Sequence, residues 1–180
     1  MESKATVNSE SPVGPGSDAA FELFFRAHYP GVVRIAHNVV GDNSTAQDVA
    51  QDVFIAVQRR FSALNGPSHA AAWVRVAAVH AGLNALRGRR RLDDRHLRAA
   101  VSVSPAGPEE LVLQDISRQE VREALARLSP RAATVLVLRH SGLSYAEVAG
   151  AMGVGIGHVG TMLRRAEAAM RKEIEHATHS

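Results

Sequence analysis

The sequence has 180 residues, of which 46% are hydrophobic and 22% charged, with a formal net charge of +3 at pH 7. A chain of this length and hydrophobic content can form one domain or two small ones. It contains no cysteine, which excludes disulfides and thiolate metal sites. No apolar run approaches the roughly 18 residues of a membrane span, since the most apolar region, 70–86, carries Arg75 and His80.

The first 17 residues are polar and lack the apolar core of a signal peptide. We therefore expect residues 1–17 to form a disordered tail and the protein to be cytoplasmic. Charge is unevenly distributed beyond the tail. Residues 17–98 contain 11 arginines and 7 acidic residues, a net charge of +4, whereas residues 109–175 contain 9 basic and 9 acidic residues. This difference predicts that a nucleic-acid-binding surface lies in the first half.

Helical periodicity runs through nearly the whole chain and predicts an all-α fold of two small helical domains joined by a flexible linker. The first domain is expected over residues 18–91, with helices at about 18–40, 44–61 and 69–87 or beyond. Asp18 is placed to cap the first helix, which continues past Pro30. Residues 44–47, Ser-Thr-Ala-Gln, fit a capping box that opens the second helix.

The helix predicted over residues 44–61 has one apolar and one polar face. On the polar face, Asp48, Gln51 and Asp52 surround a single isoleucine, Ile55. An aliphatic side chain ringed by polar groups is typical of a small protein-docking surface. An exposed isoleucine can also have no function, and the pattern alone leaves both interpretations open.

The helix that follows carries a stripe suited to single-stranded DNA. The stripe consists of Trp73, Ala77, His80, Asn84, Arg87 and Arg91, with Arg89 and Arg90 extending its basic end. Bases stack on aromatic rings while guanidinium groups hold phosphates. The alternative is that Trp73 is a partly buried core residue and the arginines form a solvated helix end.

Residues 92–108 are predicted to be the linker, and residues 109–175 the second domain, again helical. In the second domain Ser129 precedes Pro130, the order expected of an N-cap and the first helical residue. Ser144 and Glu147 fit a capping box, and Gly153 is placed to make a tight turn between two short helices. This spacing predicts a DNA-binding helix-turn-helix, although such helix pairs also occur as structural units.

Three segments together carry a family resemblance. They are AQDVAQDVFIAV (46–57), AAWVRVAAVHAGLNALRGRRR (71–91) and LARLSPRAATVLVLRHSGLSYAEVAGAMGV (125–154). In this order, the chain resembles an extracytoplasmic-function (group IV) sigma factor of bacterial RNA polymerase over roughly residues 19–173. The first segment is similar to that family's core-polymerase-binding helix, usually Ala-Glu-Asp-Leu-Val-Gln-Glu-Val-Phe. The second is similar to its promoter-melting helix, and the third to its upstream-element domain.

The resemblance implies a role for each surface. Asp48, Gln51, Asp52 and Ile55 would bind the clamp helices of the polymerase's largest subunit. The minus-ten element would contact Asn65, Trp73, His80, Asn84, Arg87, Arg89, Arg90 and Arg91, with Asn65 holding a flipped base. The linker would thread the RNA-exit path. The minus-thirty-five element would contact Arg131, Ser144, Tyr145, Gly157, His158, Thr161, Arg164 and Arg165. The implied partners are core RNA polymerase, promoter DNA and an anti-sigma factor.

The sequence also departs from the family's pattern. His80 stands where asparagine is usual, and Asn84 where aspartate is usual. In the last helix the usual Gly-Thr-Val-Lys-Ser-Arg becomes Gly-His-Val-Gly-Thr-Met at residues 157–162. Two polar or basic contacts are therefore lost, and we expect the second domain to hold phosphates more than it specifies bases.

A second function remains compatible with this loss: a sigma-like protein that binds polymerase or a regulator without directing initiation. The stripe around Trp73 argues against it. No catalytic residue, metal site, cofactor or membrane insertion is expected. No cluster of carboxylates with histidine and no glycine-rich phosphate loop occurs.

Overall fold

The computed structural model describes residues 15–64, 66–97 and 109–178. Every regular element in these ranges is helical, which confirms the all-α prediction for them. The α-helices are α1 (Pro15–Val40), α2 (Asn43–Gln58), α3 (Pro67–Leu97), α4 (Glu109–Arg127), α5 (Pro130–His140), α6 (Tyr145–Met152) and α7 (Ile156–Thr178), and a short 3-10 turn covers Phe61–Ala63.

Two helix starts in the first half differ from the prediction. Helix α1 begins at Pro15, so Asp18 lies in its first turn and residues 15–17 of the expected tail are helical. Residues 1–14 lie outside the described ranges. Helix α2 is capped by Asp42, whose carboxylate accepts a hydrogen bond of 2.8 Å from the backbone N–H of Thr45. The capping box predicted at residues 44–47 was therefore wrong. Asp42, whose backbone is extended, is the N-cap, and its side chain accepts the hydrogen bond from a backbone amide in the first turn of the helix.

Helix α3 continues to Leu97, so residues 92–97 of the linker expected over residues 92–108 are helical. Residues 98–108 lie outside the described ranges, as does Asn65. Both helix caps predicted in the second half are confirmed. Ser129 caps α5 with Pro130 as its first residue, and Ser144 and Glu147 form the reciprocal capping box of α6.

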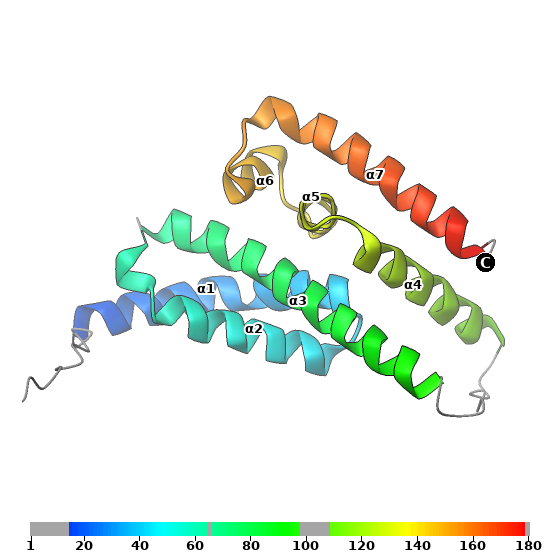
Figure 1. Cartoon of the computed structure of the whole chain (residues 1–180). Helices are drawn as coiled ribbons and strands as arrows, with labels where there is room; N and C mark the ends of the chain where they lie inside the picture. Colours follow the sequence, from blue (N-terminus) through cyan, green and yellow to red (C-terminus); the bar gives the residue numbers. More distant parts are fainter. Residues whose placement is uncertain (1–14, 65, 98–108, 179–180) are drawn as a thin grey trace, which may run out of the picture.

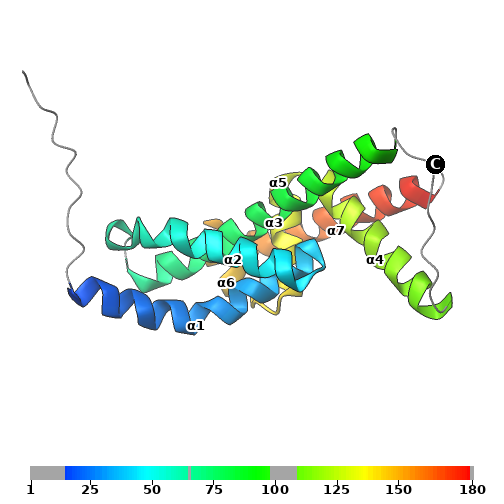
Figure 2. The same ribbon diagram turned by 90° about the horizontal axis from the view of Figure 1, so that it is seen from below.

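Helix α3 occupies the middle of the molecule, with α1 and α2 on one side and the C-terminal helices on the other (Figure 1). It contacts α1, α2, α5 and α6 along its length. In the view from below, α1 and α2 run side by side, and α4 extends away from the bundle near the C-terminus (Figure 2). The helix that carries the predicted DNA stripe is thus the element on which both halves of the chain pack.

The core runs without interruption from one half to the other. In α3, Val79, Leu83 and Leu86 are buried, whereas Val76 is half-buried. Gly82 lets α3 approach α1 closely, because a Cβ there would lie 3.1 Å from the Cβ of Val39. The buried cluster continues into the second half through side chains of α4 to α7, including Leu125, Leu136, Leu138, Val148 and Val159.

Candidate polymerase and nucleic-acid interfaces

The polar face of α2 is exposed as the sequence predicts. Asp48, Gln51 and Asp52 are all exposed, and Ile55 between them is 44% exposed. The opposite face is buried, because Val49, Val53, Phe54 and Val57 pack into the core. This face therefore presents two carboxylates and an amide around one aliphatic side chain, the arrangement expected of a docking surface.

A groove beside this face includes side chains that the sequence prediction missed. A cavity of about 350 Å³ lies between α1 and α2, and Phe21, Phe25 and Tyr29 of α1 line it together with Gln51 and Ile55. The three aromatic residues recur every four positions, so they share one face of α1. The rings of Phe25 and Tyr29 pack on Phe54 of α2, with centroids 4.9 Å and 5.7 Å away, and the ring of Phe21 packs on Phe61. The four-residue spacing was the signal available in the sequence.

Only part of the stripe on α3 is exposed to solvent. His80 and Asn84 are exposed, and Trp73 is half-buried against the core. Arg87 is engaged by the second half of the chain: its Nε donates to the Ala126 carbonyl at 3.0 Å, and a terminal nitrogen donates to the Leu128 carbonyl at 3.1 Å. These carbonyls lie at the C-terminal end of α4, where helix carbonyls lack intrahelical partners.

Among the other arginines of α3, Arg89 lies away from the stripe. It donates to the Val40 carbonyl and to the Asp42 carboxylate, both at 3.1 Å, and so holds the turn between α1 and α2. The backbone and side-chain hydrogen bonds from Thr45, together with Arg89, keep the pKa of Asp42 below its usual value. Arg90 is half-buried, and Arg91 is exposed at the end of the stripe.

In the helix-turn-helix, α6 and α7 are joined by a tight turn at Gly153, which adopts φ +63°. Ser144 and Tyr145 are exposed at the N-terminus of α6. The Tyr145 ring lies close to Gly160 of α7, since a Cβ on that glycine would be 3.8 Å from the ring. The Arg139 guanidinium stands over the same ring, 5.6 Å from its centroid. Tyr145 is thus held by two neighbours while one side remains open.

The N-terminal end of α7 presents few polar side chains. Gly157 and His158 are exposed, as are Arg164 and Arg165 farther along, while Thr161 is half-buried and accepts a hydrogen bond from Arg164 at 3.3 Å. Arg131 is exposed in the first turn of α5.

Ile156 is 57% exposed at the first position of α7, and the sequence prediction did not include it. Its place directly before Gly157, at the start of the helix, was the available signal.

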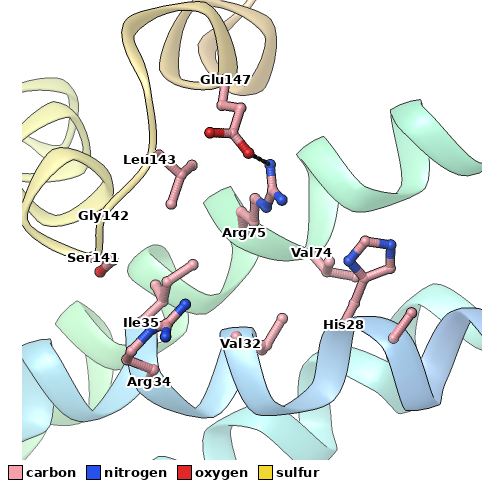
Figure 3. Close-up of a pocket in the computed structure, with 12 residues that line it drawn as sticks. His28, Val32, Arg34, Ile35, Val74, Arg75, Ser141, Gly142, Leu143 and Glu147 are labelled. Carbon is pink, nitrogen blue, oxygen red and sulfur yellow. Dashed lines mark ion pairs between the residues drawn. The ribbon is translucent and has the colours of Figure 1, made fainter.

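A cavity of about 260 Å³ lies beside α3, where the two halves meet. Its lining includes His28 and Arg34 of α1, Arg75 of α3, and Glu147 of α6. Arg75 points from α3 toward α6, and its guanidinium lies 3.5 Å from the Glu147 carboxylate (Figure 3). Hydrogen bonds from the backbone N–H and the hydroxyl of Ser144 lower the pKa of Glu147, so its carboxylate stays charged beside Arg75. Burial, followed by the nearby Arg75 charge, lowers the pKa of His28.

Within the described ranges, no three His, Cys, Asp or Glu side chains come together where they could hold a metal ion. None of the helices in those ranges is long and apolar enough to cross a membrane.

Comparison with known proteins finds two family models in chain order. The model for sigma-70 region 2 matches residues 24–92, and the model for sigma-70 region 4 matches residues 118–170. The RNA polymerase sigma-H factor of Pseudomonas aeruginosa is 29% identical over 176 residues, covering 89% of each chain. The ECF RNA polymerase sigma factor SigE of Mycolicibacterium smegmatis is 28% identical over 185 residues, covering 96% of this chain and 71% of the relative.

Among solved structures, CnrH in complex with the cytosolic domain of CnrY matches with a TM-score of 0.54 at 19% identity. The match covers 88% of this chain and 89% of the other. At this identity the likeness supports the helical fold.

Proposed function

The chain belongs to the sigma-70 family, as a sigma factor of the extracytoplasmic-function type, and we propose that it directs promoter recognition and transcription initiation by bacterial RNA polymerase. The observation that carries this proposal is the match of sigma-70 regions 2 and 4, in order, to the two helical halves of the chain. In both halves, polar or basic side chains are exposed on the helices that the family uses for binding.

Core polymerase would bind the face of α2 made by Asp48, Gln51, Asp52 and Ile55. The support is their common exposure around one aliphatic side chain. The adjoining aromatic groove between α1 and α2 would extend the same contact, because its apolar lining can bury a partner side chain.

The separated strand of the minus-ten element would run along α3. Asn84 and His80 are exposed there beside the half-buried Trp73, and Arg91 adds positive charge at the end of the stripe. An aromatic ring with neighbouring amide and guanidinium groups favours unstacked bases over a duplex. Asn65, the proposed holder of a flipped base, belongs to this contact by its place in the sequence.

The minus-thirty-five element would meet the helix-turn-helix, with α7 in the major groove and α6 across the backbone. Arg131, Arg164 and Arg165 would hold phosphates, because all three are exposed. Ser144 and Tyr145 would add contacts from the N-terminus of α6, and Gly157, His158 and Thr161 would lie nearest the bases.

We further propose that the protein acts in the cytoplasm by binding alone, with no catalytic residue of its own, and that an anti-sigma factor restrains it. Membership of the extracytoplasmic-function type supports each of these statements.

Transcription by core polymerase on genomic DNA tests the proposal directly. Addition of the purified chain should yield new transcripts with defined start sites. Stable binding to core polymerase without any new transcript would instead favour an interaction protein that does not direct initiation.

A triple variant tests the polymerase contact. Replacing Asp48, Gln51 and Asp52 together with alanine should weaken co-purification with core polymerase by at least about tenfold, because two charges and an amide that face the partner are lost at once. Helix content should not change, because all three side chains are exposed. The matched control replaces two acids and an amide on α4, Gln119, Glu120 and Glu123, and should bind normally. Unaltered co-purification of the α2 variant would contradict this assignment.

A further inference from the structure

Both helices of the helix-turn-helix begin with an exposed apolar side chain. Tyr145, the first residue of α6, is 44% exposed, and Ile156, the first residue of α7, is 57% exposed. Within the described ranges, four other large hydrophobic side chains are comparably exposed, one each on α1, α2, α3 and α4. Tyr145 and Ile156 alone stand at the starts of the helices that would dock on upstream DNA.

The surroundings of Ile156 leave it prominent at the tip of α7. Its two neighbours in the chain, Gly155 and Gly157, have no side chains, and a Cβ on Gly157 would meet nothing within 4 Å. The imidazole of His158 folds back toward the turn, since a Cβ on Gly155 would lie 3.2 Å from its Nδ1. The tip of the helix therefore offers an aliphatic surface with open space beside it.

The direction of this side chain follows from its place in the helix. Every Cα–Cβ bond in an α-helix tilts toward the N-terminus, so the side chain of the first residue projects off the end of the helix. In a helix-turn-helix, the N-terminal residues of the second helix contact base edges in the major groove. Ile156 is therefore placed to reach the bases, whereas the exposed Arg164 and Arg165 lie about two turns farther along α7.

An aliphatic side chain in the major groove favours one base over the others. The C5-methyl of thymine is the methyl group that base pairs present there, and the remaining groups that identify a base are hydrogen-bond donors and acceptors. Removing that methyl group and an isoleucine from water together is favourable. The amino group of cytosine or adenine, in contrast, would lose its hydrogen bonds to water against the same side chain.

We propose that Ile156 selects thymine in the upstream promoter element by packing on its C5-methyl group. This inference rests on the proposed function as a sigma factor, because it requires α7 to lie in the major groove. One buried methyl group changes affinity by at most about fourfold. Ile156 therefore biases the upstream sequence toward thymine at one position without making that base indispensable.

Uracil in place of thymine tests the proposal, because it removes the methyl group and leaves every hydrogen-bonding group in place. The measurement is binding of the full chain with core polymerase to a promoter identified by transcription of genomic DNA. Each thymine of the upstream element, on either strand, is replaced in turn. We expect uracil at one position to weaken binding by about two- to fourfold. Cytosine at that position should also weaken binding, and 5-methylcytosine should restore part of the loss.

A serine variant identifies the side chain that contacts the methyl group. Ile156→Ser should bind the thymine and uracil promoters equally, because its short polar side chain has no aliphatic surface to offer. Leu23→Ser is the matched control, since Leu23 is an aliphatic residue of α1 that is 71% exposed and belongs to no proposed surface. This control should keep the full preference for thymine over uracil.

Two results would overturn the role of Ile156. One is a natural chain whose binding no uracil substitution in the upstream element weakens. The other is an Ile156→Ser variant that keeps the natural preference for thymine over uracil, because another side chain would then contact the methyl group. Failure of the proposed function is distinct: the natural chain with core polymerase would form no complex even with the unsubstituted promoter.

Discussion

Arg87 and Arg89 are two residues apart on α3, and each satisfies the carbonyls at the end of another helix. Arg87 bonds to the Ala126 and Leu128 carbonyls at the end of α4, and Arg89 to the last carbonyl of α1, at Val40. Terminal carbonyls lack intrahelical partners and carry the negative end of the helix dipole, which favours a cation there. Two arginines that the sequence predicts to bind DNA therefore also hold helices together. Arg89 does so within the first half, and Arg87 does so between the halves.

At the same scale, His28 should make stability depend on pH. Its ring lies against Phe24, with centroids 4.6 Å apart, in the cavity lined by Arg34, Arg75 and Glu147. Burial and the Arg75 charge hold its pKa below the ordinary value of 6.5. The unfolded chain thus takes up this proton more readily, so the free energy of unfolding should fall as the pH drops below about 6.5. Glu147 stays ionised in this window, because its own pKa is lowered.

Denaturant unfolding of the natural chain and of His28→Gln at pH 7.5 and 5.5 measures this effect. Glutamine keeps a polar side chain but takes up no proton, so the variant should lose less stability on acidification. Both proteins share the other eight histidines, so the comparison isolates the contribution of His28. An identical pH dependence in the two proteins would show that His28 is not responsible.

At the scale of the helices, periodicity and caps predicted most of the architecture. The caps at Ser129 and Ser144 form as predicted because each depends on neighbours within three residues. The cap of α2 was misplaced because Asp42 and Ser44 are both good capping residues, and only the backbone conformation selects between them. The contact of α3 with α5 and α6 was not predicted. It joins residues far apart in the sequence, such as Arg75 and Glu147, and no local pattern encodes such pairing.

The same limit applies to the candidate surfaces. The exposed face of α2 followed from helical spacing alone, since burial of Val49, Val53 and Val57 leaves the other face to solvent. The position of Arg87 on α3 was also predictable, but its partners on α4 were not. Helical periodicity gives the direction in which a side chain leaves its helix. It does not say which other helix lies in that direction.

Helix α3 should have its effect where DNA strands separate. Changing Asn84 to alanine should reduce complex formation on a duplex promoter several-fold more than on a promoter with a pre-opened minus-ten region, because stacking and amide contacts favour the unpaired strand. Arg87→Ala should share this defect, but it also removes two hydrogen bonds to carbonyls at the end of α4, so Asn84 gives the clearer result. Asn43→Ala, an exposed amide at the start of α2, is the matched control. An equal loss on both templates would indicate general phosphate binding.

For the whole molecule, the two halves differ in what they offer to DNA. The first half carries the excess of arginine together with an aromatic ring and exposed amides, and the second half has no net charge over residues 109–175. Phosphate contacts position a protein without specifying sequence, whereas base-edge contacts specify. This division predicts that promoter specificity lies mainly in the minus-ten element.

The helix-turn-helix should accordingly hold upstream DNA more than it selects it. A bidentate side-chain contact discriminates between bases by about 1–3 kcal/mol. Near the N-terminus of α7, however, Gly157 offers no side chain, and the Thr161 hydroxyl already accepts a hydrogen bond from Arg164. Single-base changes in the upstream element should therefore cost less than about 1 kcal/mol each, below the cost of changes in the minus-ten element.

Arg164→Ala and Arg165→Ala should weaken binding to many upstream sequences alike, and each should reduce the salt dependence of binding by about one counterion. Both guanidinium groups are exposed on α7 beyond its N-terminal turns, where a phosphate contact acts through charge and carries no base information. Arg171→Ala, an exposed arginine farther along the same helix, is the matched control and should leave upstream binding unchanged. A mutational scan of the promoter provides the decisive comparison, because it measures every base of both elements on one scale. One or two upstream bases as indispensable as any minus-ten base would show that His158, Thr161 or Arg164 contacts base edges after all.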